Sequence, residues 1–483
     1  MLYLMLLMAL SISCWSNLDE DDDYGPIVAE TIREKQLFVR KMTMEAFHSY
    51  HRYAWGANSL SSVSGKAEKL PFGRTTGLTI VASLSTLWVM NMDDEYRLAR
   101  EWIEHDFQFD NIDPSLITGL NIIPSYMGGL LSAYALTNDS LYLQKSFSIE
   151  KQLRSVLYQS SKSSSSQSST PSLYNLNSTY IRYLADLARN QPEYVYLTRM
   201  GNIPHQMNIT RFIGLIDQMN PLEDSFTELL KLDFYYTLIR LYLQSGDRDH
   251  WLLYTYQQLI EHIEQHRKSD SLFFAKLYDE KLKRQREVMY DAASYVGGML
   301  ALGSDAIKRL ERFNKQNVMK LKKHSDRHMW MAQQLTEKIH QAASSTKTGL
   351  IPSAFFTDED GLGGSPWWGK SNQLIPSLAE SYFILWRLTK DQRYRIYAWE
   401  MVKAIYRHCR TNLNAYSGIY DVNQVPSIHG DYMKPQFISG TLKYLYLIFE
   451  DDEQILPLSQ WFFNQHGHPL PICGRNPNYS NCL

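Results

Sequence analysis

The sequence predicts a mostly α-helical protein with one large core. Apolar and aromatic side chains recur at spacings of three and four residues through most of the chain, whereas alternating, strand-like patterns are short and scarce. Hydrophobic residues make up 44% and aromatic residues 13% of the 483 residues, which is enough to fill a large core. Because no internal linker divides the chain, we expect one domain larger than usual.

The predicted helices follow one another with polar turns between them. The helical spacing is clearest in seven segments: Glu95–Phe109, Gly128–Ala135, Asp224–Ser245, His250–His266, Met329–Ala342, Leu378–Leu388 and Tyr394–Cys409. Turn-forming clusters such as Thr389-Lys-Asp separate them. The Ser-rich stretch Ser160–Ser172 interrupts the pattern and is typical of a surface loop.

The N-terminal segment indicates entry into the secretory pathway. Met1–Ile12 is almost wholly apolar, Ser13 and Ser16 are small residues at plausible cleavage positions, and the acidic run Asp19–Asp23 follows. The apolar stretch is too short to span a bilayer but matches the core of a signal peptide. Because no Lys or Arg precedes it, an uncleaved anchor is the alternative, and a cytosolic protein comes third.

Charge excludes one broad class of partner. Lys and Arg total 49 against 51 Asp and Glu, a net charge of −2. Such a chain has no basic field for nucleic acid, so we expect no nucleic-acid partner, and contact with a membrane only through an uncleaved N-terminal segment. Four N-glycosylation triplets agree with secretion, at Asn138, Asn177, Asn208 and Asn478.

The cysteines are too few for a disulfide scaffold. Of the four, Cys14 would leave with a signal peptide. Cys473 and Cys482 are close in sequence, in a tail rich in Gly, Pro and Asn, and could bridge. Cys409 lies in a helical pattern, and we expect it to be a buried free thiol.

Many segments resemble glycoside hydrolase family 47, the class I α-1,2-mannosidases, in the order in which that family has them. In the first two thirds of the chain they are Tyr53-Ala-Trp-Gly56, Thr79–Met90, Ala99–Ile103, Gly128–Tyr134, Asp224–Glu228, Leu300–Gly303 and Thr348-Gly-Leu350. In the last third, which is the most similar, they are Glu380–Arg387, His408–Thr411, Gly418–Val422, Thr441–Tyr446 and Asn464–Pro469.

This resemblance implies an all-α fold, an (α/α)7 barrel in which a C-terminal hairpin plugs one end. On this view residues 1–16 are a signal peptide or anchor, 17–30 an acidic linker, 31–470 the barrel and 471–483 a tail. It further implies an inverting mannosidase of the endoplasmic reticulum or Golgi that trims high-mannose N-glycans. In such enzymes one carboxylic acid protonates the leaving oxygen and a carboxylate on the opposite face activates water. A Ca²⁺ ion, whose direct protein ligand is a single Thr, binds the sugar hydroxyls.

The two reacting carboxylates of the family are both replaced here. Asn121 stands where the acid Glu is expected, and Ser125 replaces a nearby Arg. The Arg-Pro-Glu triplet that carries the base Glu has become Ile375-Pro376-Ser377. An amide does not donate a catalytic proton, and a serine hydroxyl does not activate water without a base of its own.

The calcium ligand and other acidic positions are replaced as well. Gln465 stands in place of the Ca²⁺-ligating Thr, and His466 in place of the following Glu, so calcium binding is doubtful. Further family carboxylates correspond to Ala82, Ser85, Ser353, Lys434 and Gly440, and a mid-chain Glu corresponds to Ile181.

Two acidic residues remain at positions that matter in the family. Asp224 corresponds to a third catalytic carboxylate, and Glu380 lies one turn after the lost base, among substrate-binding positions. Each also has a purely structural explanation. Asp224 could cap the helix that follows it, and Glu380 could be an acidic residue in a polar interior.

These substitutions predict a barrel without hydrolytic activity. General acid and base groups each contribute about 10²–10⁴ in rate, so losing both should remove nearly all turnover. We expect a protein that binds high-mannose glycans or glycoprotein clients in quality control in the endoplasmic reticulum. The alternatives are an active, divergent, Ca²⁺-dependent mannosidase and an interaction protein without sugar binding.

Two further patterns have ordinary explanations. The pairs His262/His266 and His324/His328 have helical spacing but no third ligand, and surface histidines explain them better than a zinc site. Trp367 and Trp368 could stack on sugar rings, although core or interface packing explains adjacent tryptophans more often.

Overall fold

The computed structural model describes residues 29–68, 76–109, 123–163, 190–201, 225–266, 275–279, 284–311, 318–357 and 364–480. In its first part the helices are α2 (Ile32–Ala54), α3 (Leu78–Val89), α4 (Asp93–His105), α6 (Gly128–Thr137), α7 (Ser140–Ser163) and α9 (Gln191–Met200), with the π-helical turn η2 (Ile123–Met127) before α6. The later helices are α11 (Ser225–Gln244), α12 (His250–His266), α13 (Val296–Glu311), α14 (Val318–Ser344), α15 (Ser377–Thr389), α16 (Arg393–Cys409) and α17 (Lys443–Leu447), and the short turns are η4 (Asp291–Ala293), η5 (Phe437–Leu442) and η6 (Pro477–Tyr479).

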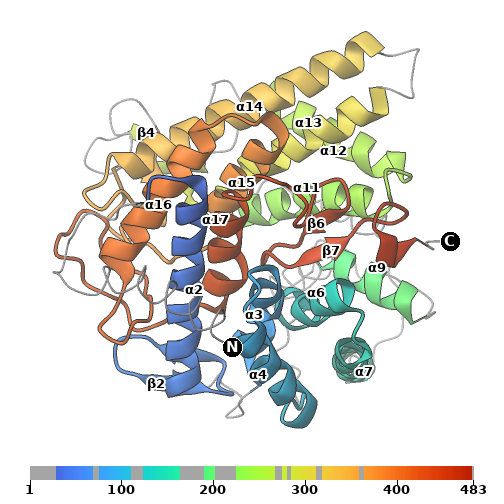
Figure 1. Cartoon of the computed structure of the whole chain (residues 1–483). Helices are drawn as coiled ribbons and strands as arrows, with labels where there is room; N and C mark the ends of the chain where they lie inside the picture. The colour runs from blue at the N-terminus through green and yellow to red at the C-terminus, as the bar shows by residue number, and fades with distance from the viewer. Residues whose placement is uncertain are drawn as a thin grey trace.

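Inner helices close into a ring around one axis (Figure 1). In contact order the ring runs α3, α6, α9, α11, α13, α15 and then η5 with α17, and η5 packs back on α3. Outer helices cover it: α4 packs on α3, α7 on α6, α12 on α11, α14 on α13 and α16 on α15. The N-terminal helix α2 lies against α17 near the other end of the chain. The predicted (α/α)7 barrel is therefore confirmed.

Side-chain polarity explains which helices lie inside. A helix that is apolar on all sides must be surrounded by protein, whereas one with a single apolar stripe can face water. In α3 every residue from Leu78 to Leu87 is buried, and in α15 every residue from Ser377 to Arg387. The outer helix α4 buries only Ala99 and Ile103 and turns its charged residues outward.

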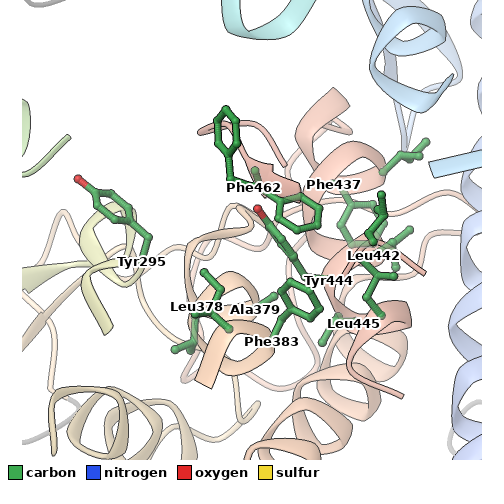
Figure 2. Close-up of a cluster of buried hydrophobic side chains, with 14 of the residues drawn as sticks. Tyr295, Leu378, Ala379, Phe383, Phe437, Leu442, Tyr444, Leu445 and Phe462 are labelled. Carbon is green, nitrogen blue, oxygen red and sulfur yellow. The ribbon is translucent and has the colours of Figure 1, made fainter. Parts of the chain in front are cut away.

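A C-terminal β-hairpin plugs the ring. Strand β6 (Trp461–Phe463) pairs antiparallel with β7 (Pro469–Pro471), and the two strands pack on α11 and α6, respectively. The ring of Phe463 lies 5.5 Å from that of Phe383 and 5.2 Å from that of Tyr444. Figure 2 shows the neighbouring Phe462 with the apolar side chains of α15, η5 and α17. The plug is thus part of the main core.

The remaining strands are short, as expected. Strands β1 (Ser59–Ser61) and β2 (Lys66–Glu68) form one hairpin, and β3 (Ala275–Asp279), β4 (Arg284–Tyr290) and β5 (Ala354–Phe356) form a second small antiparallel sheet. They lie in the segments that lead into the inner helices α3, α13 and α15. Backbone bridges such as Leu60 to Met433 and Asn372 to Ile419 tie these segments together. We call the end of the barrel that they form the loop face.

Several predicted boundaries were wrong. Helix α4 ends at His105 rather than Phe109, because Phe107 and Phe109 turn into the core, where both rings pack near Tyr126. The predicted segment Met329–Ala342 is only part of the 27-residue helix α14. Helix α7 continues to Ser163, so the first residues of the predicted Ser-rich loop 160–172 are helical, and the rest lie outside the described residues.

The explanation of His328 as a surface residue was also wrong. Its side chain is buried with its ring edge against Tyr256, and burial lowers its pKa to about 3. His324 contacts Glu261 at 3.3 Å. No group of three or more His, Cys, Asp or Glu side chains that could hold a metal occurs in the part of the chain that the structure describes.

Two of the four cysteines, Cys409 and Cys473, lie among the described residues. Cys409 is a buried free thiol whose pKa is raised by burial. Cys473 is disulfide-bonded, and Cys482 lies outside the described residues. Within the described ranges, no helix is long and apolar enough to cross a membrane.

Candidate active site

The candidate site lies where the tip of the β6–β7 hairpin meets the start of inner helices. Gln465 and His466 form the tip, and contacts reach them from η2 and η5. Asn121 and Asp224 lie outside the described residues, although α11 begins directly after Asp224. Ser125, Ile375, Ser377, Glu380 and Gln465 are all described, so most of the predicted site can be placed.

Two of the substituted positions bond to each other. Ser125 Oγ lies 2.8 Å from Nδ1 of His466, and both side chains are buried. The carbonyl oxygen of His466 accepts a hydrogen bond of 2.8 Å from Ser439 Oγ. Where the family has an Arg and a Glu, this chain therefore has a hydroxyl–imidazole pair without a carboxylate.

Ser377, at the predicted base position, packs at the start of α15. Ser377 is buried, and its Oγ donates to the carbonyl oxygen of Ala292 at 3.3 Å. A Cβ on Gly440, another position predicted to lack a carboxylate, would lie 2.6 Å from Cβ of Pro376. Gly440 also touches the hairpin tip, since a Cβ on Gly467 would lie 2.7 Å from its Cα. A side chain at position 440 would therefore require η5 or the start of α15 to move.

Glu380 is retained inside the ring, where α11 holds it. Its Oε1 accepts a hydrogen bond of 2.6 Å from Tyr236 Oη and lies 3.4 Å from a guanidinium nitrogen of Arg240. The Arg240 guanidinium stacks 3.6 Å from the Tyr236 ring centroid. Burial raises the pKa of Glu380 to about 7, although Arg240 and the Tyr236 hydrogen bond act in the opposite direction. Glu380 therefore links α11 to α15 and titrates near neutrality.

A second buried carboxyl group, Glu193, was missed by the sequence analysis. Its Oε1 accepts a hydrogen bond of 2.7 Å from Asn464 Nδ2, at the base of the hairpin. Burial raises its pKa to about 7, with the Asn464 hydrogen bond and Arg240 opposing the shift. The only local signal was an acidic residue in the first turn of a helix that starts Gln191-Pro192, which is a common helix start.

A buried lysine contacts one of the predicted substituted positions. Lys443 Nζ donates to Ser85 Oγ at 2.6 Å and to the carbonyl oxygen of Gly467 at 2.7 Å. Burial lowers the pKa of Lys443 well below its usual value of 10.5. The neighbouring His468 is also fully buried, and burial together with Lys443 lowers its pKa.

The hairpin tip does not suit the family's calcium ion. Gln465 Nε2 is directed at Asn190 Oδ1 at 3.4 Å, and the following residue is His466, whose imidazole contacts Ser125. Ca²⁺ takes hard oxygen ligands. The amide nitrogen that faces Asn190 and the imidazole supply no such oxygen, so we derive no step through calcium.

Ile375 lines a cavity away from the hairpin tip, and Lys434 acts on another residue that lines it, Asp291. Ile375 is half-buried and lines a cleft of about 320 Å³ together with Asp291. Burial raises the pKa of Asp291 to about 7, partly offset by the charge of Lys434. Ala82 is buried and Ser353 is half-buried with bonds to the 369–371 loop, while Ile181 lies outside the described residues.

Two of the four glycosylation triplets can be placed. Asn138 caps the end of α6 and is exposed. Asn478 is exposed too, but its Nδ2 donates to the carbonyl oxygen of Ala135 at 3.2 Å, so glycosylation there would replace that bond. Asn177 and Asn208 lie outside the described residues.

The closed helical ring and the hairpin that plugs it define an α/α-barrel protein. Comparison with known families agrees: residues 42–231 and 201–472 match glycosyl hydrolase family 47. The chain belongs to this family.

Curated relatives match over nearly the whole chain. Mannosyl-oligosaccharide alpha-1,2-mannosidase IA of Drosophila melanogaster is 31% identical, over 93% of this chain and 69% of its own length. The endoplasmic reticulum mannosyl-oligosaccharide 1,2-alpha-mannosidase of Rattus norvegicus is 30% identical, over 91% and 68%. The solved alpha-1,2-mannosidase from Trichoderma reesei shares the fold, with a TM-score of 0.64 at 19% identity, over 92% of this chain and 100% of that one.

Proposed function

We propose that this family member binds high-mannose N-glycans, or the glycoproteins that carry them, in the secretory pathway without hydrolysing them. The observation that carries the proposal is the packing at the place of the lost base. There Ser377 bonds to a backbone carbonyl group and Gly440 packs on Pro376. Inverting hydrolysis needs a carboxylate and a water molecule at that place. The names of the relatives support the substrate class and, for the rat protein, the compartment.

The loop face offers a surface for such a ligand. Trp367 is 85% exposed, so of the two expected kinds of packing, core or interface, the core is ruled out; it lies in the loop that leads into α15. Trp368 stacks on Tyr290 of strand β4 with 5.8 Å between ring centroids and thereby anchors the loop. An exposed indole face suits the apolar C–H face of a pyranose ring, because both surfaces then leave water.

The first test measures turnover and binding on the same preparation. A high-mannose oligosaccharide is incubated with the protein in Ca²⁺ and in a chelator, and released mannose is measured. We expect no release in either condition. Fluorescence-detected binding of the same oligosaccharide should be measurable, and Trp367→Ala should weaken it about fivefold or more. Trp330→Ala, an exposed tryptophan on α14, is the matched control.

Each alternative has its own outcome. Robust calcium-dependent release of mannose would support a divergent enzyme and overturn the proposal. Absence of both release and binding would support an interaction protein without sugar binding. The divergent enzyme is favoured by one observation, namely that Glu380 has a pKa of about 7, a value suited to general acid catalysis near neutrality. If the protein does release mannose, Asp224→Asn and Glu380→Gln should each abolish the measured turnover.

A further inference from the structure

A second cavity lies outside the ring, between two outer helices. It has a volume of about 320 Å³, which is at the lower end of small-molecule pockets. Helix α14 contributes His340 and Ser344 to one wall, α16 contributes residues from Tyr397 to His408 to the other, and Leu378 and Tyr382 of α15 also line it. We call this cavity the α14–α16 cleft. Ser125, Ser377 and His466 do not line it, whereas Ile375 does, so it adjoins the candidate active site without including the hairpin tip.

Three cations line this cleft. Lys403 and Arg407 lie four residues apart and therefore on one face of α16, and Lys347 follows the end of α14. None of the three side chains has an ion-pair partner within the described ranges. The acidic residue on the same face, Glu400, already contacts His340 Nε2 at 3.3 Å. The cleft therefore carries a net positive charge that the protein leaves uncompensated.

Helix ends do not account for these cations. Cations near a helix C-terminus often compensate its unpaired carbonyl groups. Here other donors bond to those carbonyl groups. Ser345 Oγ donates to the carbonyl oxygen of Ala342 at 2.8 Å at the end of α14. At the end of α16, Ser417 N donates to the carbonyl oxygen of Cys409 at 2.8 Å.

A buried carboxyl group with one unsatisfied oxygen also lines the cleft, and the charge of Lys434 acts on it. Asp291 is 3% exposed, and its Oδ1 has no hydrogen-bond partner among the described residues. A buried polar atom without a partner costs about 1–3 kcal/mol, so a ligand that supplies a hydroxyl group there gains that bond. The apolar walls between Asp291 and the cations come from residues such as Leu350, Leu374 and Met401.

We propose that the α14–α16 cleft binds a hexose phosphate. The phosphate lies between Lys347, Lys403 and Arg407, a sugar hydroxyl group bonds to Asp291, and the ring fills the space between. Three phosphate oxygens match the number of cations, and charge-assisted hydrogen bonds of this kind are about twice as strong as neutral ones. The cavity volume suits a monosaccharide rather than a branched oligosaccharide, which distinguishes this site from the loop face.

Calorimetric titration with mannose 6-phosphate, inorganic phosphate and mannose tests the proposal. We expect the sugar phosphate to bind at least about tenfold more tightly than either of the other probes, because only it reaches both Asp291 and the cations. Lys403→Glu and Arg407→Glu should each weaken its binding about tenfold or more. Lys322→Glu, an exposed lysine of α14 outside the cleft, should leave it unchanged.

The variant Asp291→Ala tests whether the cleft recognises the sugar as well as the phosphate. This variant should bind inorganic phosphate like the parent but lose most of its preference for mannose 6-phosphate. The proposal would be overturned if the parent bound inorganic phosphate and mannose 6-phosphate equally tightly, or bound neither. It would also be overturned if neither Lys403→Glu nor Arg407→Glu weakened the binding of mannose 6-phosphate. Thermal melting of every variant checks that it folds. Lys403→Glu should bind the high-mannose oligosaccharide as tightly as the parent does. Failure of the hexose phosphate proposal can therefore be distinguished from failure of the proposed function.

Discussion

At the scale of single residues, the barrel buries ionisable groups that hydrogen-bond to neutral partners. Lys443 bonds to a hydroxyl and a carbonyl oxygen, and Glu193 bonds to one amide, where opposite charges would stabilise them better. An ionised group without a charge partner is costly to bury, and the usual result is a shift of its pKa toward the neutral form. Both shifts make folding stability depend on pH, in opposite directions.

Lys443 should make the protein more stable as the pH rises. Its pKa is lowered in the folded state, whereas in the unfolded chain it keeps its usual value of 10.5. Below pH 10.5 the unfolded state therefore binds more protons, and the free energy of unfolding falls as the pH falls. Relative to Lys443→Met, the parent should gain stability as the pH rises toward 10. Urea unfolding at a series of pH values measures the free energy of unfolding, with Lys322→Met as the control. If the stabilities of the parent and Lys443→Met changed equally with pH, the prediction for Lys443 would be contradicted.

Glu193 should have the opposite effect. Its pKa rises from 4.5 to about 7 on folding, so between these values the folded state binds more protons and stability falls as the pH rises. Glu193→Gln keeps the acceptor for Asn464 but cannot ionise. It should match the parent near pH 4.5 and exceed it by up to about 3 kcal/mol at pH 7.5. A stability difference that is the same at both pH values would argue against a shifted carboxyl group.

At the scale of elements, the contact between η5 and the start of α15 has replaced a polar part of the site. Gly440→Ala tests how closely these two elements pack. A Cβ there would lie 2.6 Å from Cβ of Pro376, so one element must move, and we expect a loss of about 1–3 kcal/mol. Gly430→Ala is a control, since its Cβ would have no neighbour closer than 3.5 Å. Denaturant unfolding that finds the two variants equally stable would show that the site has room.

The sequence predicted elements better than contacts. Amphipathic spacing identified α11, α12, α15 and α16 within a few residues of their ends, because that spacing is local. The hydrogen bond between Glu193 and Asn464 joins residues 271 positions apart, and no local pattern encodes such a pair. Asp291 was missed for the same reason. The family resemblance located Ser377 and Gln465, but it could not tell that Gly440 and Pro376 would fill the space.

At the scale of the whole molecule, the hairpin plug holds the ring together. Phe463 contacts Phe383 of α15 and Tyr444 of α17, while its strand packs on α11. Phe463→Ala should cost about 3–5 kcal/mol, because the cavity would lie in the main core. Trp367→Ala removes a side chain that is mostly in water and should cost less than about 1 kcal/mol. Thermal melting compares the two variants. Equal decreases in Tm would contradict a core role for the plug.

The closure of the ring also has a consequence for synthesis. Helix α3, near the start of the chain, completes the ring only through its contact with η5, and α2 packs on α17. These two early helices therefore lack η5 and α17 as partners until about residue 447 has been made. During vectorial synthesis their apolar faces stay open to chaperones for most of the time that the ribosome needs. A nascent chain stalled before Phe437 should therefore remain chaperone-bound and protease-sensitive, however many of its helices have already formed.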